Sequence, residues 1–254
     1  MQRYKLTIEY NGEGYAGWQR QPDIMSVQQA IEEAITAFTQ KELRIHVAGR
    51  TDAGVHACGQ VAHFDLPELK REMQPFEIAK AINAHLRPRT ISIIGVEKVS
   101  SDFEARFHAK NKLYRYRVIN RPGFLAIEQG LAWHILKPLN VEAMQEAAKR
   151  LIGHHDFSTF RAAECQANSP MKTLDRLDVS VRDYDLCGGK EIIFETEGQS
   201  FLHHQVRNMV GTLSLVGEGK WSAQDMQEAL EKKNRAAGGP TAPAHGLYLM
   251  RVDY

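Results

Sequence analysis

Alternating apolar and polar residues mark several strands along the chain. Residues 3–10 place Tyr4, Leu6, Ile8 and Tyr10 at every second position, which is the spacing of one face of a half-buried strand. Shorter apolar runs, bounded by glycine, proline, asparagine or aspartate, predict further strands. These strands are expected at residues 43–47, 60–66, 90–99, 112–119, 177–181, 191–197 and 247–252, with a short apolar run at 131–136.

Apolar residues spaced three or four apart predict helices between these strands. Ser26 and Gln29 form an S-x-x-Q capping box that opens the first helix, a second starts near Pro75, and Asn140 caps a third. Two more helices are expected at about 203–216 and 222–231. The expected apolar faces are Val27, Ile31, Ile35 and Phe38 in the first, Phe76, Ala79 and Ile82 in the second, and Val141, Met144, Ala148 and Leu151 in the third.

The order of these elements predicts an α+β fold in two halves. Each half mixes hairpin-like strand pairs with two helices, which is unlike regular βαβ winding. The boundary is expected near residues 103–112, giving an N-terminal half of residues 1–105 and a C-terminal half of 106–254. With 43% hydrophobic and 25% charged residues among 254, the composition is that of an ordinary globular protein.

No membrane segment or secretion signal is expected. The longest uninterrupted apolar runs are only a few residues, and the N-terminus enters a strand pattern directly. The cysteines Cys58, Cys165 and Cys187 are odd in number and far apart. This usage favours reduced thiols and a cytoplasmic setting.

The loop at residues 49–56, Gly-Arg-Thr-Asp-Ala-Gly-Val-His, holds the strongest candidate chemistry. It lies between two strand-like runs and presents one carboxylate, Asp52, between glycines and beside the guanidinium of Arg50. A rigid scaffold often displays a nucleophile or general base in this way. The alternative is an ordinary connecting loop in which Asp52 caps a turn.

Comparison with known motifs narrows the chemistry of this loop. Gly49 and Gly54 have Walker-type spacing, but the Lys-Ser/Thr that a P-loop needs does not follow. His56, Cys58 and His63 suggest a zinc site, yet the sequence has neither H-x-E nor C-x-x-C, as a zinc deaminase requires. The residues therefore favour a carboxylate site that uses neither a metal nor a cofactor.

Two further patterns concern a polyanionic partner. Residues 105–127 contain no acidic residue, and Tyr114 and Tyr116 are interleaved among their basic side chains. Basic residues with aromatics suit RNA, whereas a solvated basic strand is the plain alternative. On a predicted helix, His203, Arg207 and Gly211 share a stripe, an arrangement suited to gripping a carboxylate or a backbone. The basic side chains are Arg106, Lys110, Lys112, Arg115, Arg117 and Arg121.

Together these segments resemble the tRNA pseudouridine synthase A family over nearly the whole chain. The resemblance implies two pseudo-symmetric α+β halves, each with a mainly antiparallel sheet, an active-site cleft between them, and a homodimer. The segments that carry it occur in family order at 17–19 (Gly-Trp-Gln), 49–56, 103–107 (Phe-Glu-Ala-Arg-Phe), 112–116 (Lys-Leu-Tyr-Arg-Tyr), 156–161 (Asp-Phe-Ser-Thr-Phe-Arg), 203–211 and 242–249.

The resemblance also implies an activity, the isomerisation of uridine to pseudouridine in the anticodon stem–loop of tRNA, without metal or cofactor. Asp52 carries over as the nucleophile or base, Arg207 as the partner that keeps it ionised, and Tyr114 as the ring stacked on the uracil. Arg50 would hold the nucleotide flipped out of the stack. The further expected RNA-binding residues are Lys110, Lys112 and Arg115.

Two rival functions are compatible with parts of the same sequence pattern. A silent RNA-binding protein would use the basic strand alone, and Asp52 would then have no chemical role. A metal-dependent nuclease normally needs several clustered carboxylates, whereas the acidic residues nearest to Asp52 in the sequence are Glu42 and Asp65. The residues also leave open whether Asp52 attacks C6 of the base, attacks C1′, or removes a ribose proton.

Overall fold

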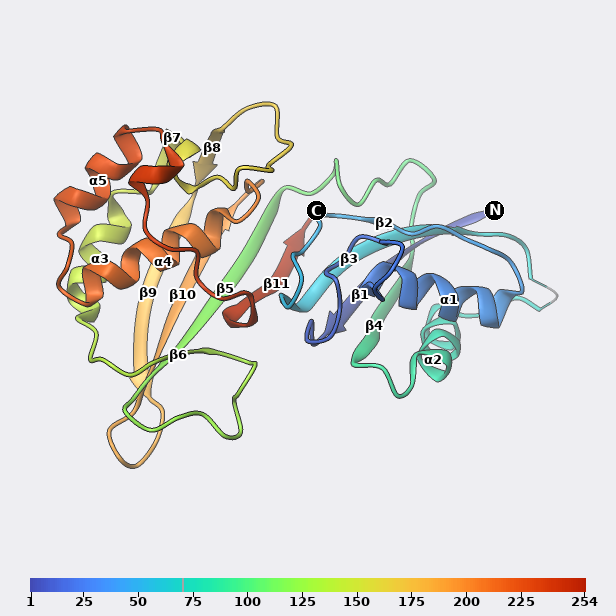
Figure 1. Ribbon diagram of the computed structural model, residues 1–254. Coiled ribbons are helices and arrows are strands. Elements are labelled where there is room, and N and C mark those ends of the chain that lie inside the picture. Colours follow the sequence, from blue (N-terminus) through green and yellow to red (C-terminus); the bar gives the residue numbers. More distant parts are fainter. Residues whose placement is uncertain (70) are drawn as a thin grey trace. The chain divides into compact units, whose positions relative to one another are not determined.

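The computed structural model describes residues 1–69 and 71–254. Its contacts divide the chain into unit 1, residues 1–110 and 249–254, and unit 2, residues 111–248. Both units combine mainly antiparallel strands with helices, and the described residues contain five α-helices (Figure 1). The mixed fold expected from the sequence is therefore confirmed. Unit 1 also takes in the end of the last strand, which the expected division places in the C-terminal half.

Unit 1 is built on a sheet in the order β4-β1-β3-β11, with β2 added to β3. The alternation of residues 3–10 is confirmed, because Tyr4, Leu6, Ile8 and Tyr10 are all buried. The helices α1 and α2 contact each other, and α2 contacts β4. The elements are β1 (Gln2–Tyr10), α1 (Val27–Thr39), β2 (His46–Val47), β3 (His56–Leu66), α2 (Pro75–Leu86), β4 (Ile91–Lys98) and β11 (Leu247–Asp253).

Unit 2 contains the antiparallel order β5-β10-β9, with β6 parallel to β5, and a separate β7-β8 pair. The helices α3, α4 and α5 contact one another beside these strands (Figure 1). The elements are β5 (Asn111–Asn120), β6 (Trp133–Ile135), α3 (Val141–Lys149), β7 (Gly153–Asp156), β8 (Met171–Leu174), β9 (Arg176–Asp183), β10 (Lys190–Gly198), α4 (Gln205–Gly217) and α5 (Ala223–Glu231), with 3₁₀ turns at Ser158–Phe160, Arg235–Ala237 and Ala244–Gly246.

Helix caps follow the sequence in two places and depart from it in a third. Asn140 caps α3 by accepting the N–H of Ala143 at 2.9 Å, as expected. Ser26 caps α1 through the N–H of Gln29 at 3.2 Å, but the expected capping box is wrong on its second half. The Gln29 side chain does not turn back to Ser26, because its Nε2 donates to Glu33 along the helix at 3.0 Å.

The expected apolar face of α2 is wrong at Phe76 and confirmed at Ile82. Phe76 is 70% exposed, and the buried face consists of Ile78, Ile82 and Leu86. These three residues follow one another at intervals of four, so they continue one stripe that Phe76 does not join. Within the described ranges, no helix is both long and apolar enough to span a membrane.

Candidate active site

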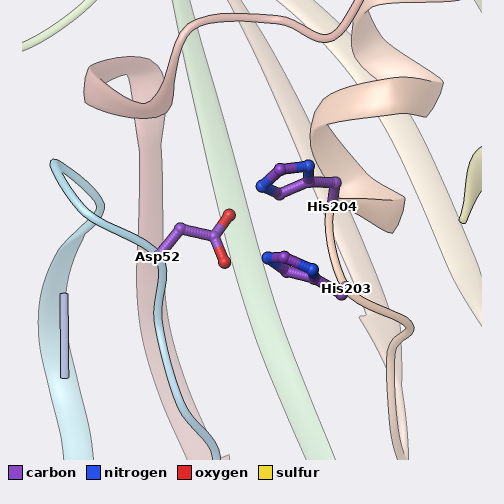
Figure 2. Close-up of side chains that lie close together, drawn as sticks. All are labelled: Asp52, His203 and His204. Atoms are coloured by element: carbon purple, nitrogen blue, oxygen red, sulfur yellow. The ribbon is translucent and has the colours of Figure 1, made fainter. Parts of the chain in front are cut away.

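The loop that carries Asp52 connects β2 to β3 in unit 1, and its first residues are tied to β3. The N–H of Ala48 donates to the carbonyl of Val61 at 2.8 Å and so extends the β2–β3 ladder. Gln60 of β3 reaches back, and its Nε2 donates to the carbonyl of Gly49 at 2.9 Å. Asp52 is half-buried and stands on the turn that follows these ties (Figure 2). The carboxylate is therefore displayed on a fixed backbone.

Residues 12–18 lie as a second backbone layer against this turn. The N–H of Trp18 donates to the carbonyl of Thr51 at 3.0 Å. A Cβ at Gly17 would lie 2.6 Å from that carbonyl oxygen, and the φ of Gly17 is +83°, so only glycine fits without strain. A Cβ at Gly12 would collide with the carbonyl of Val55. The Gly-Trp-Gln segment thus permits close backbone approach to the Asp52 turn.

Buried polar side chains support the same turn from the sheet. The hydroxyls of Tyr10 and Thr51 are 2.8 Å apart and hydrogen-bonded. Burial raises the pKa of Tyr10 to about 12, against the lowering effect of its hydrogen bonds with Thr51 and Gln60. His56 Nδ1 accepts the N–H of Gly12 at 3.0 Å. These contacts fix the residues on both sides of Asp52, while Arg50 on the same loop is exposed.

The alternative zinc site is not assembled as a cluster. His56 Nδ1 accepts a backbone N–H, as described above, and His63 Nδ1 accepts the N–H of Ala105 at 3.2 Å. The other ring nitrogen of His63 lies 3.6 Å from a carboxylate oxygen of Glu104. A lone pair used by an N–H is not available to a metal, so in the described residues each histidine serves a structural contact.

In unit 2, Tyr114 lies on β5 and faces an aromatic partner. It is 8% exposed, and its ring meets the ring of Phe201 edge-on, with centroids 5.1 Å apart. Phe201 lies between β10 and α4. Edge-to-face contacts restrict how a ring can turn, so Phe201 sets the plane of Tyr114.

Arg207 of α4 grips a backbone segment of its own unit. Its Nε donates to the carbonyl of Ala242 at 2.8 Å, and the N–H of Ala242 donates to the carbonyl of Arg207 at 3.1 Å. A Cβ at Gly211, one turn further on, would collide with the carbonyl of Pro240. The sequence indicated that this stripe of the helix could grip a carboxylate or a backbone, and Arg207 holds a backbone carbonyl. The bond at Nε fixes the plane of the guanidinium.

The 242–249 segment is held from β5 as well. The hydroxyl of Tyr116 donates to the carbonyl of Pro243 at 2.7 Å. A Cβ at Gly246 would lie 2.5 Å from the Tyr116 ring, so this glycine lets the ring and the backbone meet. Burial raises the pKa of Tyr116 well above its usual value, although nearby Arg207 lowers it. Tyr116 therefore stays a neutral donor.

The expected place of His203 on α4 is wrong. The helix begins at Gln205, and His204 precedes it with a φ of 62°, a left-handed conformation that cannot continue a right-handed helix. The carbonyl of His203 accepts the N–H of Ala162 at 3.0 Å, and its N–H donates to Cys165 Sγ at 3.4 Å. The two histidine rings lie 4.0 Å apart on this turn (Figure 2).

The basic strand is largely neutralised within unit 2. Arg115 donates to Glu195 of β10 at 2.6 Å, and Arg117 donates to Glu191 at 2.6 Å and to Glu128 at 2.8 Å. Of the expected RNA-binding residues in this region, Lys110 is exposed, whereas Lys112 is buried, with only 9% of its surface exposed. The sequence shows the arginines without their glutamates, of which Glu195 lies directly opposite Arg115 on β10 and Glu191 lies two residues from the strand partner of Arg117.

Comparison with known proteins gives a consistent result over the full chain. A sequence model of the tRNA pseudouridine synthase family matches residues 6–108 and 147–254. The chain belongs to the tRNA pseudouridine synthase family. The matched ranges contain Asp52, Arg50 and Arg207, whereas Tyr114 lies in the stretch between the two ranges.

Relatives of this synthase family align along the entire chain. A tRNA pseudouridine synthase A of Paramagnetospirillum magneticum is 53% identical over 254 residues, covering 100% of this chain and 96% of the relative. Proteins of the same name from Rhizobium meliloti and Rhodopseudomonas palustris are 52% and 53% identical, with 100% of both chains covered. The solved structure of an unknown protein from Galdieria sulphuraria is 12% identical, with a TM-score of 0.21 over 86% of this chain and 92% of that chain.

Some residues that shape the site of this synthase were missed in the sequence. Tyr10, Gly12 and Phe201 contact the Asp52 turn or Tyr114, yet none stands inside a segment that carries the resemblance. Tyr116 does lie in such a segment, where its alternation with Tyr114 signals that both occupy one face of β5. Asp52 and Arg50 share one loop of unit 1, and Tyr114, Lys112, Arg115 and Arg207 belong to unit 2.

Proposed function

We propose that the protein isomerises uridine to pseudouridine in the anticodon stem–loop of tRNA. The observation that carries this proposal is the identity of just over half of all residues, along the whole chain, with proteins named tRNA pseudouridine synthase A. The clamped Asp52 turn supports it independently. A loop held by this many backbone contacts suits a carboxylate that must meet a reacting atom in one geometry.

The reaction exchanges one glycosidic bond for another. The N1–C1′ bond breaks, the uracil turns while it stays bound, the C5–C1′ bond forms, and the proton on C5 leaves as N1 takes one up. Asp52 serves as the nucleophile or base. Attack on C6, attack on C1′ and removal of a ribose proton are all compatible with a single half-buried carboxylate.

The other side chains have supporting roles in the proposal. Arg207 is the cationic partner of Asp52, because a nearby guanidinium favours the charged form of a carboxylate. Tyr114 stacks on the uracil, and its hydroxyl assists removal of the C5 proton. Arg50 helps to hold the nucleotide flipped out of the RNA stack. Because Arg50 is exposed, its guanidinium is well suited to bind a phosphate.

We include in the same proposal several further properties that the family resemblance implies. They are the pseudo-symmetry of the two halves, an active-site cleft between them, a homodimer, a cytoplasmic setting, and a reaction without metal or cofactor. Residues 1–105 would supply the Asp52 loop, and residues 106–254 would supply Tyr114 and Arg207. An isomerisation needs no net input of electrons or bond energy, which agrees with catalysis by side chains alone.

The decisive experiment is the Asp52→Asn variant with an unmodified tRNA transcript. We expect it to fold and to bind tRNA but to form no detectable pseudouridine, because the amide keeps the shape and loses the anionic charge. Asp23→Asn, which changes an exposed aspartate of the same unit, is the matched control and should retain activity. Substantial pseudouridine from Asp52→Asn would remove Asp52 from its role, whereas no pseudouridine from the parent protein would favour a silent RNA-binding protein.

A further inference from the structure

A buried carboxylate in unit 1 holds two exposed arginines side by side. Glu32 of α1 is 4% exposed, and its Oε2 accepts from Nη1 of Arg20 at 3.3 Å and from Nη1 of Arg44 at 2.9 Å. Its Oε1 accepts from Nε2 of Gln28 at 3.0 Å and from the N–H of Ile45 at 3.3 Å. The carboxylate is thus fully hydrogen-bonded, and the two guanidiniums share one of its oxygens.

This cluster has more positive charge than the carboxylate needs. One guanidinium neutralises a buried carboxylate, so the second leaves a net positive charge at the surface. The Arg20 and Arg44 side chains are 46% and 66% exposed, so both guanidiniums bind the buried carboxylate and also face the solvent. The excess positive charge of the pair therefore lies at the surface.

Both arginines keep donors for a further acceptor. A guanidinium has five N–H donors in a fixed fork. Across residues 1–69 and 71–254, the guanidiniums of Arg20 and Arg44 each make their hydrogen bond through Nη1. The bond to a rigid, buried oxygen restricts each side chain to one direction, which lowers the entropy lost when it meets a second anion.

The arginine pair is attached to the two segments that frame the Asp52 turn. Arg44 precedes β2, which leads directly into the turn. The N–H of Arg20 donates to Oε1 of Gln28 at 3.2 Å, and the N–H of Gln28 donates to the carbonyl of Trp18. Trp18 is the residue whose N–H reaches the carbonyl of Thr51. A ligand on the pair therefore rests on the same framework that positions Asp52.

We propose that Arg20 and Arg44, oriented by the buried Glu32, form a site for backbone phosphates of the RNA substrate beside the Asp52 turn. The inference rests on the proposed function, since it takes the ligand to be RNA. Arginine forks match phosphate oxygens, and two adjacent forks suit neighbouring phosphates of one strand. Nearby exposed Lys41 and Glu42 have opposite charges and leave the sign of this surface to the arginine pair.

The test is the salt dependence of binding to an unmodified tRNA transcript. Each lost phosphate contact flattens the plot of log affinity against log salt by about 0.7–0.9, so Arg20→Ala/Arg44→Ala should flatten it by about 1.4–1.8. The matched control is Arg71→Ala/Arg87→Ala, which removes two exposed arginines that flank α2 in unit 1 and should keep the parent slope. Equal slopes for the two double variants would overturn the inference.

A second variant separates phosphate binding from support of the fold. Arg20→Lys/Arg44→Lys keeps both charges and should recover most of the slope, because a lysine binds phosphate as a point charge. A slope that stays flattened in this variant would mean that the arginines act by holding residues 41–45 onto α1. Pseudouridine formation by the parent protein is measured separately, so failure of the proposed function is distinguished from failure of this site.

Discussion

Single residues of the candidate site are held by different kinds of contact. Asp52 stands on a backbone fixed by its neighbours, since the carbonyl of Thr51 accepts from Trp18 and the Thr51 hydroxyl bonds Tyr10. Tyr114 is oriented instead by its own ring, which lies edge-on to Phe201. A substitution at Asp52 is therefore expected to leave its surroundings in place, whereas truncation of Tyr114 also removes a packing partner.

Changes at Tyr114 should separate stacking from proton transfer. Tyr114→Phe keeps the ring, so we expect it to bind tRNA nearly as well as the parent. Tyr114→Ala should lose about 1–3 kcal/mol of binding through lost stacking. Filter binding of an unmodified transcript measures both. Arrest of the phenylalanine variant after glycosidic cleavage would place the hydroxyl in removal of the C5 proton, while parent-like binding by the alanine variant would contradict stacking.

His63 should make stability depend on pH. It is 1% exposed, and burial lowers its pKa, with Arg3 and His46 acting in the same direction and Glu104 and Asp65 against it. Its neutral form accepts the N–H of Ala105. The unfolded chain, with a histidine pKa of about 6.5, therefore binds a proton that the folded state resists. The contribution of neutral His63 to stability is therefore fully present above that pH and is lost as the pH falls below it.

The measurement is unfolding by denaturant between about pH 7 and pH 5, a window set by the unfolded histidine pKa of about 6.5. His63→Gln keeps an acceptor for the Ala105 N–H and cannot titrate, so we expect a weaker dependence of stability on pH, by at most about 1.4 kcal/mol per pH unit. His85→Gln, at an exposed position of α2, is the control and should behave as the parent. Identical pH dependence in His63→Gln and the parent would exclude His63 as the source.

Elements whose boundaries depend on local chemistry could be predicted from the sequence. Asn140 caps α3 and the alternation of β1 buries one face, because both effects involve residues a few positions apart. The start of α4 could not be predicted, since His204 takes a left-handed conformation while the carbonyl of its neighbour His203 bonds Ala162, which is distant in sequence. Phe76 fails for a similar reason, because packing selects the Ile78 stripe.

The candidate site divides in the same way. The loop with Asp52 and Arg50 stands out by its composition and its flanking strands. The layer of backbone formed by Gly12 and Gly17 does not, because it depends on where residues 12–18 lie once the sheet has formed. The glutamates of β10 that neutralise Arg115 and Arg117 depend likewise on strand pairing. A basic run in sequence therefore overstates the charge available to RNA.

The backbone layer over the Asp52 turn can be tested with two glycines. Gly17 and Gly14 have φ values of +83° and +79°, so alanine costs similar backbone strain at both. Only the Cβ at Gly17 would meet the Asp52 turn, 2.6 Å from the carbonyl oxygen of Thr51, whereas none of the described atoms lies within 4 Å of a Cβ at Gly14. We expect Gly17→Ala to displace the turn.

The expected result is a loss of pseudouridine formation of at least about 100-fold for Gly17→Ala, since a shift of about 1 Å at a reacting group has that effect. Gly14→Ala should keep most of its activity, because it shares the backbone strain but not the clash with the turn. Single-turnover rates at saturating protein measure the difference. Equal rates for the two variants would show that the contact with Gly17 does not position the turn.

Over the whole molecule, the positive and negative charges nearly balance, with a formal net charge of +1. The individual cations differ in whether a carboxylate of the protein already neutralises them. Arg115 lies directly opposite Glu195 in the β5–β10 register and is bonded to it, so a phosphate would have to displace a carboxylate. Lys110 is exposed, and its N–H is tied to the carbonyl of Asp253 at 2.8 Å. The fixed backbone and the exposed ammonium make Lys110 the better phosphate contact.

Salt dependence of tRNA binding distinguishes these two cations. Lys110→Ala should flatten the plot of log affinity against log salt by about 0.7–0.9, the amount expected for one phosphate contact. The double variant Arg115→Met/Glu195→Gln removes the Arg115–Glu195 ion pair without a change in net charge and leaves Arg176, the other partner of Glu195, its pairs with Asp178 and Glu197. We expect it to keep the parent slope. A flattened slope in the double variant would mean that RNA displaces Glu195 and uses Arg115. A parent-like slope in Lys110→Ala would exclude Lys110 from the RNA contact.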